Sequence, residues 1–382
     1  MGMKIYGKEN VHDAALGRIR WLFDEFPNVI IGVSGGKDST VVYNLALQVA
    51  REKNRLPLKC LFVDQEAEWE STIDTIRLIM ENPEVEPLWF QMPIKLFNAT
   101  STTDHWLMCW DKKEEARWMR PQESYSIKEN VYGTERFAEL FSAIVKHDYP
   151  HIKTCYIAGM RTEESPTRAM ALTHDLTYKH ATWGANLNKA LQHYTFYPIY
   201  DWSYADVWKA IFDNKWHYNP VYDAQYNYGV PLQSMRVSNV HHETAVGTLF
   251  YMQEIEGQTY QKLTQRIAGI DMAGKMGKHD YFPRELPFMF ATWAEYRDYL
   301  LDKLIDIPEW KASFAKIFAR HDEIYGDALG AKMYKEHING ILTNDWEAVK
   351  LGNFERRPEN ISYKRTWRAK KNAAKTANPE SA

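Results

Sequence analysis

Two kinds of hydrophobic spacing alternate along the first 235 residues. Continuous apolar runs, typical of strands buried on both faces, predict strands at residues 28–33, 58–63, 85–92 (interrupted by a proline), 154–158 and from 196. Apolar residues three or four positions apart predict helices at 11–26, from 37 onward, at 69–80 and at 137–146. This alternation predicts an α/β fold, with an open, mostly parallel sheet and helices on both faces.

The pattern changes twice along the chain. Residues 94–135 interrupt the alternation with a segment rich in tryptophan and charge, and we interpret it as an insertion over the sheet edge or the active site. From residue 236 no strand pattern recurs and helical spacing dominates, for example at Trp310, Phe314 and Ile317. We therefore predict an α/β domain over 1–235 and an α-helical domain over 236–350.

The first predicted strand runs into the motif Ser34-Gly35-Gly36-Lys37-Asp38-Ser39. Two glycines permit a tight turn, and the helix that follows presents backbone N–H groups and a positive dipole end to one point. The lysine adds a cation and the serines add hydroxyl donors, so the motif predicts a phosphate site. The spacing is not that of a Walker A loop.

A second polar turn follows the strand at 154–158. It begins at Gly159 and carries Arg161, Glu164 and Arg168. Because carboxyl ends of parallel strands share one edge of the sheet, these arginines are expected beside the first loop, where they would clamp phosphate or sulfate oxygens. The alternative is an Arg–Glu network that caps the next helix.

Amino-acid composition excludes only a few classes of protein. The formal net charge of −3 shows no global bias toward nucleic acid. Three scattered cysteines, Cys60, Cys109 and Cys155, exclude a disulfide framework, and we expect no iron–sulfur cluster. The chain shows neither a signal peptide nor an apolar run of membrane-spanning length, so we expect a cytoplasmic protein with no membrane contact.

The end of the chain is basic. Residues 364–375 hold six lysines or arginines and no acidic residue, with Trp367 among them. We predict a flexible basic tail over 351–382. Such a run is either a solvated terminus or a contact to DNA or an acidic partner.

An adjacent group, His241-His242-Glu243, has metal-ligating side chains. Neighbouring residues on a helix face different directions, and no histidine follows at the four-residue spacing of a zinc helix. We therefore do not interpret it as a metal site.

Five motifs in order resemble those of one known family. They are Ser34 to Ser39, Phe62-Val63-Asp64, Gly159 to Arg168, Pro198-Ile199 with Trp202 and Asp206, and Asn219-Pro220-Val221-Tyr222-Asp223. This order resembles the phosphoadenosine phosphosulfate (PAPS) reductase family of the PP-loop superfamily, whose fold is adenine nucleotide alpha hydrolase-like. The whole chain is similar to a sulfurtransferase branch found beside ParB-like partners.

The resemblance implies roles for individual residues. Ser34, Gly35, Gly36, Lys37, Asp38 and Ser39 would hold the phosphates of ATP or PAPS, and Asp64 would frame adenine and ribose. Gly159, Arg161, Glu164, Arg168 and Arg236 would complete the nucleotide site. We take Lys37, Asp38 and Arg161 as catalytic candidates, with Asp38 as the candidate ligand of a Mg²⁺ ion.

One departure from the family changes the expected chemistry. Sulfonucleotide reductases attack sulfur with a C-terminal cysteine thiolate, and this chain has no cysteine after Cys155. Cys109, in the insertion, is the candidate substitute. Its reactivity would require an accessible, electropositive setting.

Three functions follow as hypotheses. The first is an ATP pyrophosphatase-type enzyme with adenylating or sulfurtransferase chemistry on an acceptor that a partner supplies. The second is a PAPS or adenylyl-sulfate reductase with a displaced thiol. The third is a non-catalytic, nucleotide-sensing and DNA-associated regulator that acts with a ParB-like partner.

Overall fold

The computed structural model describes residues 7–101, 104–164, 166–173, 175–237, 246–275 and 283–377. The chain divides into two compact units. The first unit comprises Met1–Leu96, Met108–Asn239 and Met252–Arg266, and the second comprises Phe97–Leu107, Val240–Tyr251 and Ile267–Ala382.

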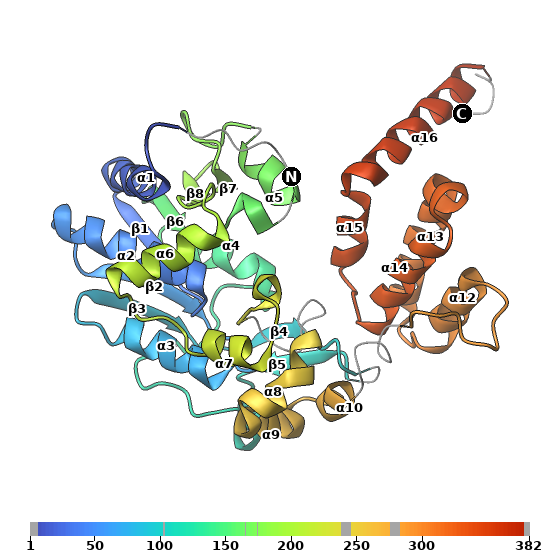
Figure 1. The fold of residues 1–382 in the computed structure, drawn as a ribbon, viewed down its shortest axis with the longest axis horizontal. Helices are drawn as coiled ribbons and strands as arrows, with labels where there is room; N and C mark the ends of the chain where they lie inside the picture. The colour runs from blue at the N-terminus through green and yellow to red at the C-terminus, as the bar shows by residue number, and fades with distance from the viewer. Residues whose placement is uncertain are drawn as a thin grey trace. The chain divides into compact units, whose positions relative to one another are not determined.

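A sheet forms the centre of the first unit (Figure 1). Within the described residues its six strands have the order β3-β2-β1-β6-β8-β7. Neighbouring strands are parallel, except that β7 runs antiparallel to β8. The strands are β1 (Asn28–Gly32), β2 (Leu58–Val63), β3 (Val85–Phe90), β6 (Thr154–Ile157), β7 (Gly184–Asn188) and β8 (His193–Phe196). The predicted open, mostly parallel sheet is confirmed.

Helices lie against the sheet in this unit, and those at residues 11–25, 37–52, 70–80 and 204–214 join the strands in one hydrophobic core. The predicted helices at 11–26, from 37, at 69–80 and at 137–146 correspond to the first four helices of this unit. The helices are α1 (Val11–Glu25), α2 (Lys37–Glu52), α3 (Glu70–Met80), α4 (Phe137–Asp148), α5 (Pro166–Thr173), α6 (Tyr204–Asn214), α7 (Val221–Tyr228) and α9 (Gly257–Arg266), with 3₁₀ turns η1 (Lys112–Arg117), η2 (Thr162–Glu164) and η3 (Leu232–Ser234).

Strand β6 shows why helices occupy both faces. Successive side chains of a strand point to opposite faces, and Cys155 and Ile157 belong to the core that α1, α2 and α6 share. Tyr156, between them, contacts Phe141 of α4, with ring centroids 5.5 Å apart. Helix α4 therefore lies on the opposite face from α2.

The sequence pattern missed the edge of the sheet. Strand β7 reads Gly-Ala-Asn-Leu-Asn, with exposed residues at its second and third positions, so it carries no apolar run. Strand β8 ends at Phe196, where the final strand was predicted to begin. The prediction missed the earlier residues because His193 and Thr195, although buried, are polar and interrupt the apolar run. The motif from Asn219 to Asp223 leads into α7, whose first helical residue is Val221.

Residues 94–135 contain the two-stranded ladder β4 (Ile94–Phe97) and β5 (Trp106–Cys109), followed by η1. Two buried carboxylates after β2, Asp64 and Glu66, anchor the residues after β5 and the end of α9. Arg120 pairs with Asp64 at 2.6 Å, and Glu66 accepts hydrogen bonds from the backbone N–H of Trp110 and from Arg266. The carboxylates of Asp64 and Glu66 are inaccessible to solvent. This segment is thus anchored by charge as well as by packing.

The second unit is helical in its described residues. Its helices are α10 (Ile270–Lys275), α12 (Trp293–Lys303), α13 (Pro308–Leu329), α14 (Ala331–Leu342), α15 (Val349–Glu355) and α16 (Pro358–Ala377); the 3₁₀ turn η4 (Val246–Thr248) belongs to it, and α8 (Leu249–Ile255) begins in it. An aromatic and aliphatic core joins α12, α13, α14 and α15, with Phe314, Phe318 and Ile338 buried in it. The helical spacing predicted from residue 236 is confirmed for the described part of this region.

Most of the segment predicted as a flexible basic tail is helical in the described residues. Over the described residues, positions from 349 onward form α15 and α16. Phe354 is fully buried, and Trp367 packs against its cluster. The tail prediction rested on charge and overlooked these apolar anchors, which give α16 a surface to pack on. None of the helices in the described residues is long and apolar enough to cross a membrane.

The buried Glu66–Arg266 pair supports a prediction about stability. Replacing Arg266 by methionine leaves an uncompensated buried carboxylate, so the free energy of unfolding should fall by about 3–5 kcal/mol. The matched control is Arg136→Met, since Arg136 forms an exposed pair with Glu139 and such pairs contribute about 1 kcal/mol or less. Urea unfolding of both variants measures the difference. Equal destabilisation would contradict the structural role of the buried pair.

Candidate functional site

Strand β1 is the point where the strand order reverses. It pairs with β2 on one side and with β6 on the other. In open α/β sheets this reversal leaves a crevice at the carboxyl ends of the two diverging strands. The loops after β1 and β6 carry the two polar motifs, so both motifs meet at this crevice.

The loop after β1 has the shape that its glycines allow. Gly35 has a φ of +67°, and a Cβ there would lie 2.8 Å from the methyl carbon of Thr72. Gly36 is the N-cap of α2 and provides no side-chain cap for the first amides of the helix. One of these amides, that of Lys37, donates to the hydroxyl of Tyr222 at 3.2 Å. The positive end of α2 lies beside this loop, a setting that favours an anion.

The two serines of the motif brace this loop. Ser39 is buried, and its hydroxyl donates to the carbonyl of Gly36 at 2.9 Å. The backbone N–H of Ser34 donates to the Ser39 hydroxyl at 3.2 Å, and the two hydroxyl oxygens lie 3.1 Å apart. The Ser39 hydroxyl thus holds the turn closed, a role that the sequence motif alone did not distinguish from ligand binding.

Gly159 allows the two loops to approach each other. A Cβ at this position would lie 2.8 Å from the carbonyl carbon of Asp38 and 2.9 Å from the backbone nitrogen of Ser39. Backbone atoms cannot move aside as a flexible side chain can. The lack of a side chain at Gly159 is therefore what lets the end of β6 touch the start of α2.

This approach brings the three predicted catalytic residues together. Asp38 accepts from the Lys37 ammonium at 2.7 Å through one carboxylate oxygen and from Arg161 Nε at 2.6 Å through the other. The Lys37 ammonium also lies 5.6 Å from the ring centre of Tyr204 and 5.8 Å from that of Tyr222. Two cations thus share one carboxylate at the mouth of the crevice.

More charge surrounds this cluster. Arg161 also donates to Glu163 at 3.0 Å, and Arg168 pairs with Glu164. Burial lowers the pKa of Arg168, the charges of Arg161 and Arg236 lower it further, and Asp38 opposes them. The guanidinium groups of Arg161 and Arg236 therefore each repel that of Arg168, as expected where an anion is to be bound.

Asp64 is a correction to the predicted site. It follows β2 as expected, but its carboxylate is fully buried and already accepts from four groups. These are Arg120 at 2.6 Å, the Trp89 indole at 2.9 Å, Gln91 at 3.0 Å and the backbone N–H of Glu66 at 2.8 Å. A carboxylate engaged in this way organises the wall of the crevice and is unavailable to a nucleotide.

Three residues outside the glycine loop shape it, a role that their sequence positions did not predict. The Asn219 side-chain amide donates to the Thr72 hydroxyl at 2.9 Å and to the carbonyl of Gly35 at 3.3 Å, and Tyr222 caps α2. Asn219 and Tyr222 belong to the motif from Asn219 to Asp223, so the sequence contained a signal for these two residues. Thr72 belongs to no motif, and only its contacts in the folded protein show that it shapes the loop.

The cysteines do not provide the missing nucleophile. All three cysteines of the chain are buried and free. Cys109 lies in β5 with its sulfur 3.1 Å from the carbonyl oxygen of Gln65, and burial raises the pKa of its thiol well above the usual value. The accessible, electropositive setting that a displaced thiol requires is absent at Cys109.

Metal ligands are sparse in the part of the chain that the structure describes. No group of three or more His, Cys, Asp or Glu side chains there is arranged to hold a metal ion. His241, His242 and Glu243 lie outside the described residues. Asp38 is the candidate Mg²⁺ ligand from the sequence, and its carboxylate is held by two cations.

Glu68 is a further titratable group beside the Asp64 network. It precedes Thr72 by about one helical turn and is almost completely buried. Burial raises the pKa of its carboxyl group to about 8; the charge of Asp64 adds to this, and Arg120 opposes it. The folded protein therefore favours the protonated form of Glu68 at neutral pH.

This pKa leads to a prediction about pH and stability. Between the reference value of 4.5 and about 8, the unfolded chain loses the Glu68 proton while the folded chain keeps it. The free energy of unfolding should therefore fall with rising pH, by up to about 1.4 kcal/mol per pH unit from this group. Glu68→Gln removes this contribution, so the variant should gain stability relative to the parent protein between pH 5 and pH 8. Denaturant unfolding at several pH values measures it, and parallel curves would refute the assignment.

Known protein families and individual proteins resemble this chain in sequence. Residues 28–228 match the family model of the phosphoadenosine phosphosulfate reductase domain, and residues 229–366 match a domain of unknown function (DUF3440). The chain is 26% identical to the uncharacterized protein YbdN of Escherichia coli, over 78% of this chain and 76% of that protein. It is 23% identical to the adenosine 5'-phosphosulfate reductase of Anoxybacillus flavithermus, over 57% of this chain and 77% of that enzyme.

The solved structures that match the chain are more distant in sequence. The PAPS reductase of Candida auris, a phosphate complex, is 15% identical over 63% of this chain and 98% of that chain, with a TM-score of 0.33. An FMN adenylyltransferase of Candida glabrata, solved with FAD and inorganic pyrophosphate, is 14% identical over 57% of this chain and 64% of that chain, with a TM-score of 0.35. The model of the phosphoadenosine phosphosulfate reductase domain family matches more than half of the residues of this chain, and the chain therefore belongs to that family.

Proposed function

We propose that the crevice between β1 and β6 binds the phosphates of an adenine nucleotide and that the protein is an ATP pyrophosphatase-type, adenylating enzyme. The observation that carries this proposal is the shared pairing of Lys37 and Arg161 with Asp38 at the open end of α2. Family membership supports the nucleotide, and the glycine loop supports the phosphate contact.

The cations of the crevice suit a polyphosphate ligand. Lys37 and Arg161 share the carboxylate of Asp38, and the charges of Arg161 and Arg236 act on Arg168. An arriving phosphate can replace Asp38 as the partner of Lys37 and Arg161. Binding then exchanges one set of charge-assisted hydrogen bonds for another rather than leaving a buried charge unpaired.

The proposed reaction is nucleotidyl transfer. An oxygen nucleophile of the acceptor attacks the α-phosphorus of ATP, a P–O bond forms to the acceptor, and the P–O bond between the α- and β-phosphates breaks. Pyrophosphate leaves with the electron pair of that bond. Lys37 and Arg161 would stabilise the charge that develops on the phosphate oxygens, which is electrostatic catalysis and needs no protein nucleophile.

The cysteines favour this chemistry over thiol-dependent reduction. A reductase needs a thiolate that can reach the substrate, and Cys60, Cys109 and Cys155 are all buried with raised pKa values. Sulfur transfer to the adenylated acceptor would therefore need sulfur from a partner. The ParB-like partner, the DNA contact and the cytoplasmic location stay predictions.

In the proposed site a Mg²⁺ ion would arrive with the triphosphate. Asp38 is the carboxylate in position to meet it once the phosphates have taken over Lys37 and Arg161. Phosphate oxygens and water would supply most of its other ligands, the usual arrangement for Mg²⁺ at nucleotides.

The reaction itself is tested by phosphorus NMR of the protein with ATP and Mg²⁺. With water as the acceptor we expect slow formation of AMP and pyrophosphate, and none with Lys37→Met. Formation of ADP and phosphate would contradict cleavage between the α- and β-phosphates. Tight nucleotide binding without any turnover would instead favour a nucleotide-sensing regulator.

Binding is tested separately by calorimetry with ATP, PAPS and adenylyl sulfate. Lys37→Met should weaken binding of the preferred nucleotide at least tenfold, about 1.4 kcal/mol, because Lys37 is the cation of the glycine loop that would contact the phosphates. Lys209→Met is the matched control, since Lys209 forms an exposed helical pair with Asp213. Equal affinities of the two variants would place the phosphates elsewhere.

A further inference from the structure

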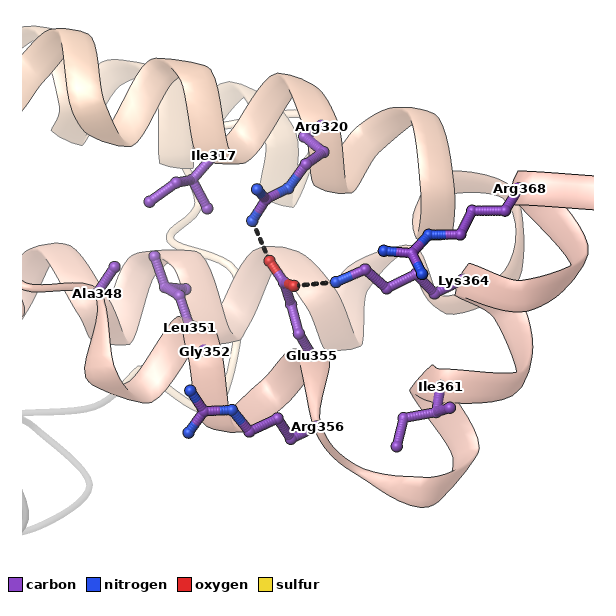
Figure 2. A pocket seen from close by; sticks show the side chains of 10 residues that line it. All are labelled: Ile317, Arg320, Ala348, Leu351, Gly352, Glu355, Arg356, Ile361, Lys364 and Arg368. Carbon is purple, nitrogen blue, oxygen red and sulfur yellow. Dashed lines mark hydrogen bonds and ion pairs between the residues drawn. The ribbon is translucent and has the colours of Figure 1, made fainter. Parts of the chain in front are cut away.

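A pocket of about 390 Å³ lies in the helical unit, between α13, α15 and α16 (Figure 2). Four basic side chains line it, Arg320, Arg356, Lys364 and Arg368. Apolar side chains from each helix form another part of its lining, Ile317, Leu351 and Ile361. The volume is within the range of small-molecule sites, and the mixed lining suits a ligand with one charged end and one apolar end.

Among the residues that line the pocket, one carboxylate, that of Glu355, lies with four basic side chains. Glu355 pairs with Arg320 and accepts from the Lys364 ammonium at 2.5 Å, as the dashed lines in Figure 2 show. Within the described residues, neither Arg356 nor Arg368 forms an ion pair with a carboxylate. The sequence neighbour Arg357 differs, because it pairs with Glu336 at 2.7 Å.

A chain of two buried histidines holds Glu355 in this position. His321 Nε2 lies 2.9 Å from a Glu355 oxygen, and His321 Nδ1 lies 2.9 Å from His337 Nε2. An ionised carboxylate only accepts, so His321 carries its hydrogen on Nε2 and accepts at Nδ1 from His337. The remaining nitrogen, His337 Nδ1, faces the Arg297 guanidinium at 3.5 Å.

Protonation states agree with this arrangement. Burial lowers the pKa of both histidines, that of His337 to about 2, so both rings are neutral at pH 7. Burial alone would raise the pKa of Glu355, but hydrogen bonds from Lys364 and His321 outweigh it and lower that pKa to about 2. Glu355 is thus an anion whose oxygens are held by Arg320, Lys364 and His321 and not by Arg356 or Arg368.

We propose that this pocket is a second anion site, which binds a small molecule carrying a phosphomonoester or sulfate group. Arg356 and Arg368 hold the anionic group, and the apolar part of the ligand rests on Ile317, Leu351 and Ile361. A phosphomonoester carries close to two negative charges at pH 7 and matches the two uncompensated guanidinium groups. This site is independent of the proposed nucleotide crevice.

Shape favours a small molecule over nucleic acid. Electrostatic contacts to a nucleic-acid backbone use basic patches or stripes that extend over a surface. Here the cations converge on one concavity, and a carboxylate lies among them. Duplex DNA is therefore the competing ligand that the experiment must include.

The experiment titrates the full chain carrying Lys37→Met, so that phosphate binding at the glycine loop does not contribute. Phenyl phosphate, phenyl sulfate, inorganic phosphate and a short DNA duplex are compared by calorimetry. We expect saturable binding of phenyl phosphate or phenyl sulfate, with inorganic phosphate at least tenfold weaker because it lacks the apolar part. Whichever phenyl ester binds more tightly identifies the anionic group.

Variants assign the signal to the pocket. The pair Arg356→Gln with Arg368→Gln should weaken binding of the preferred phenyl ester at least tenfold, whereas Arg357→Gln, the matched control, should leave it unchanged. Both arginines of the pair are exposed, so folding should be retained, and thermal unfolding checks this. Unchanged binding by the double variant, equal affinity for inorganic phosphate, or binding of the duplex alone would overturn the proposal.

Discussion

The close approach of Gly159 to the first turn of α2 is the contact on which the candidate site depends. A Cβ there would lie 2.8 Å from a backbone atom of Asp38, so any larger residue would push β6 and α2 apart. Arg161, two residues later, reaches Asp38 at 2.6 Å only because this contact is made. The site is therefore assembled by backbone proximity, and the charged side chains then complete it.

Buried carboxylates in the first unit have two different tasks. Asp64 and Glu66 are wholly enclosed, and each is satisfied by an arginine and by further donors, so they connect the segment after β5 to the sheet. Asp38 is partly accessible and is held by two cations that a phosphate can also bind. Full enclosure makes a carboxylate structural, whereas access to solvent leaves it exchangeable.

The helical unit also contains a carboxylate, that of Glu355, held in place by several partners. Glu355 is held by a lysine, an arginine and a histidine chain, so its position is set from within the unit. The charge that remains uncompensated, on Arg356 and Arg368, faces a pocket rather than a flat surface. In both units the positions of the carboxylates determine which basic side chains could bind an anionic ligand.

The sequence by itself determined the centre of the first unit. The apolar run of β1, the glycine pair and the start of α2 are local features, and backbone preference with hydrophobic spacing is sufficient to predict them. Burial of Cys60 and Cys155 also followed from their place in apolar strands. Only the tertiary structure decided the rest, because the same residue types serve different purposes depending on their partners. Asp64 became a wall residue through Arg120, β7 formed as an exposed polar edge through pairing with β8, and the basic end of the chain became helical through the packing of Phe354 and Trp367.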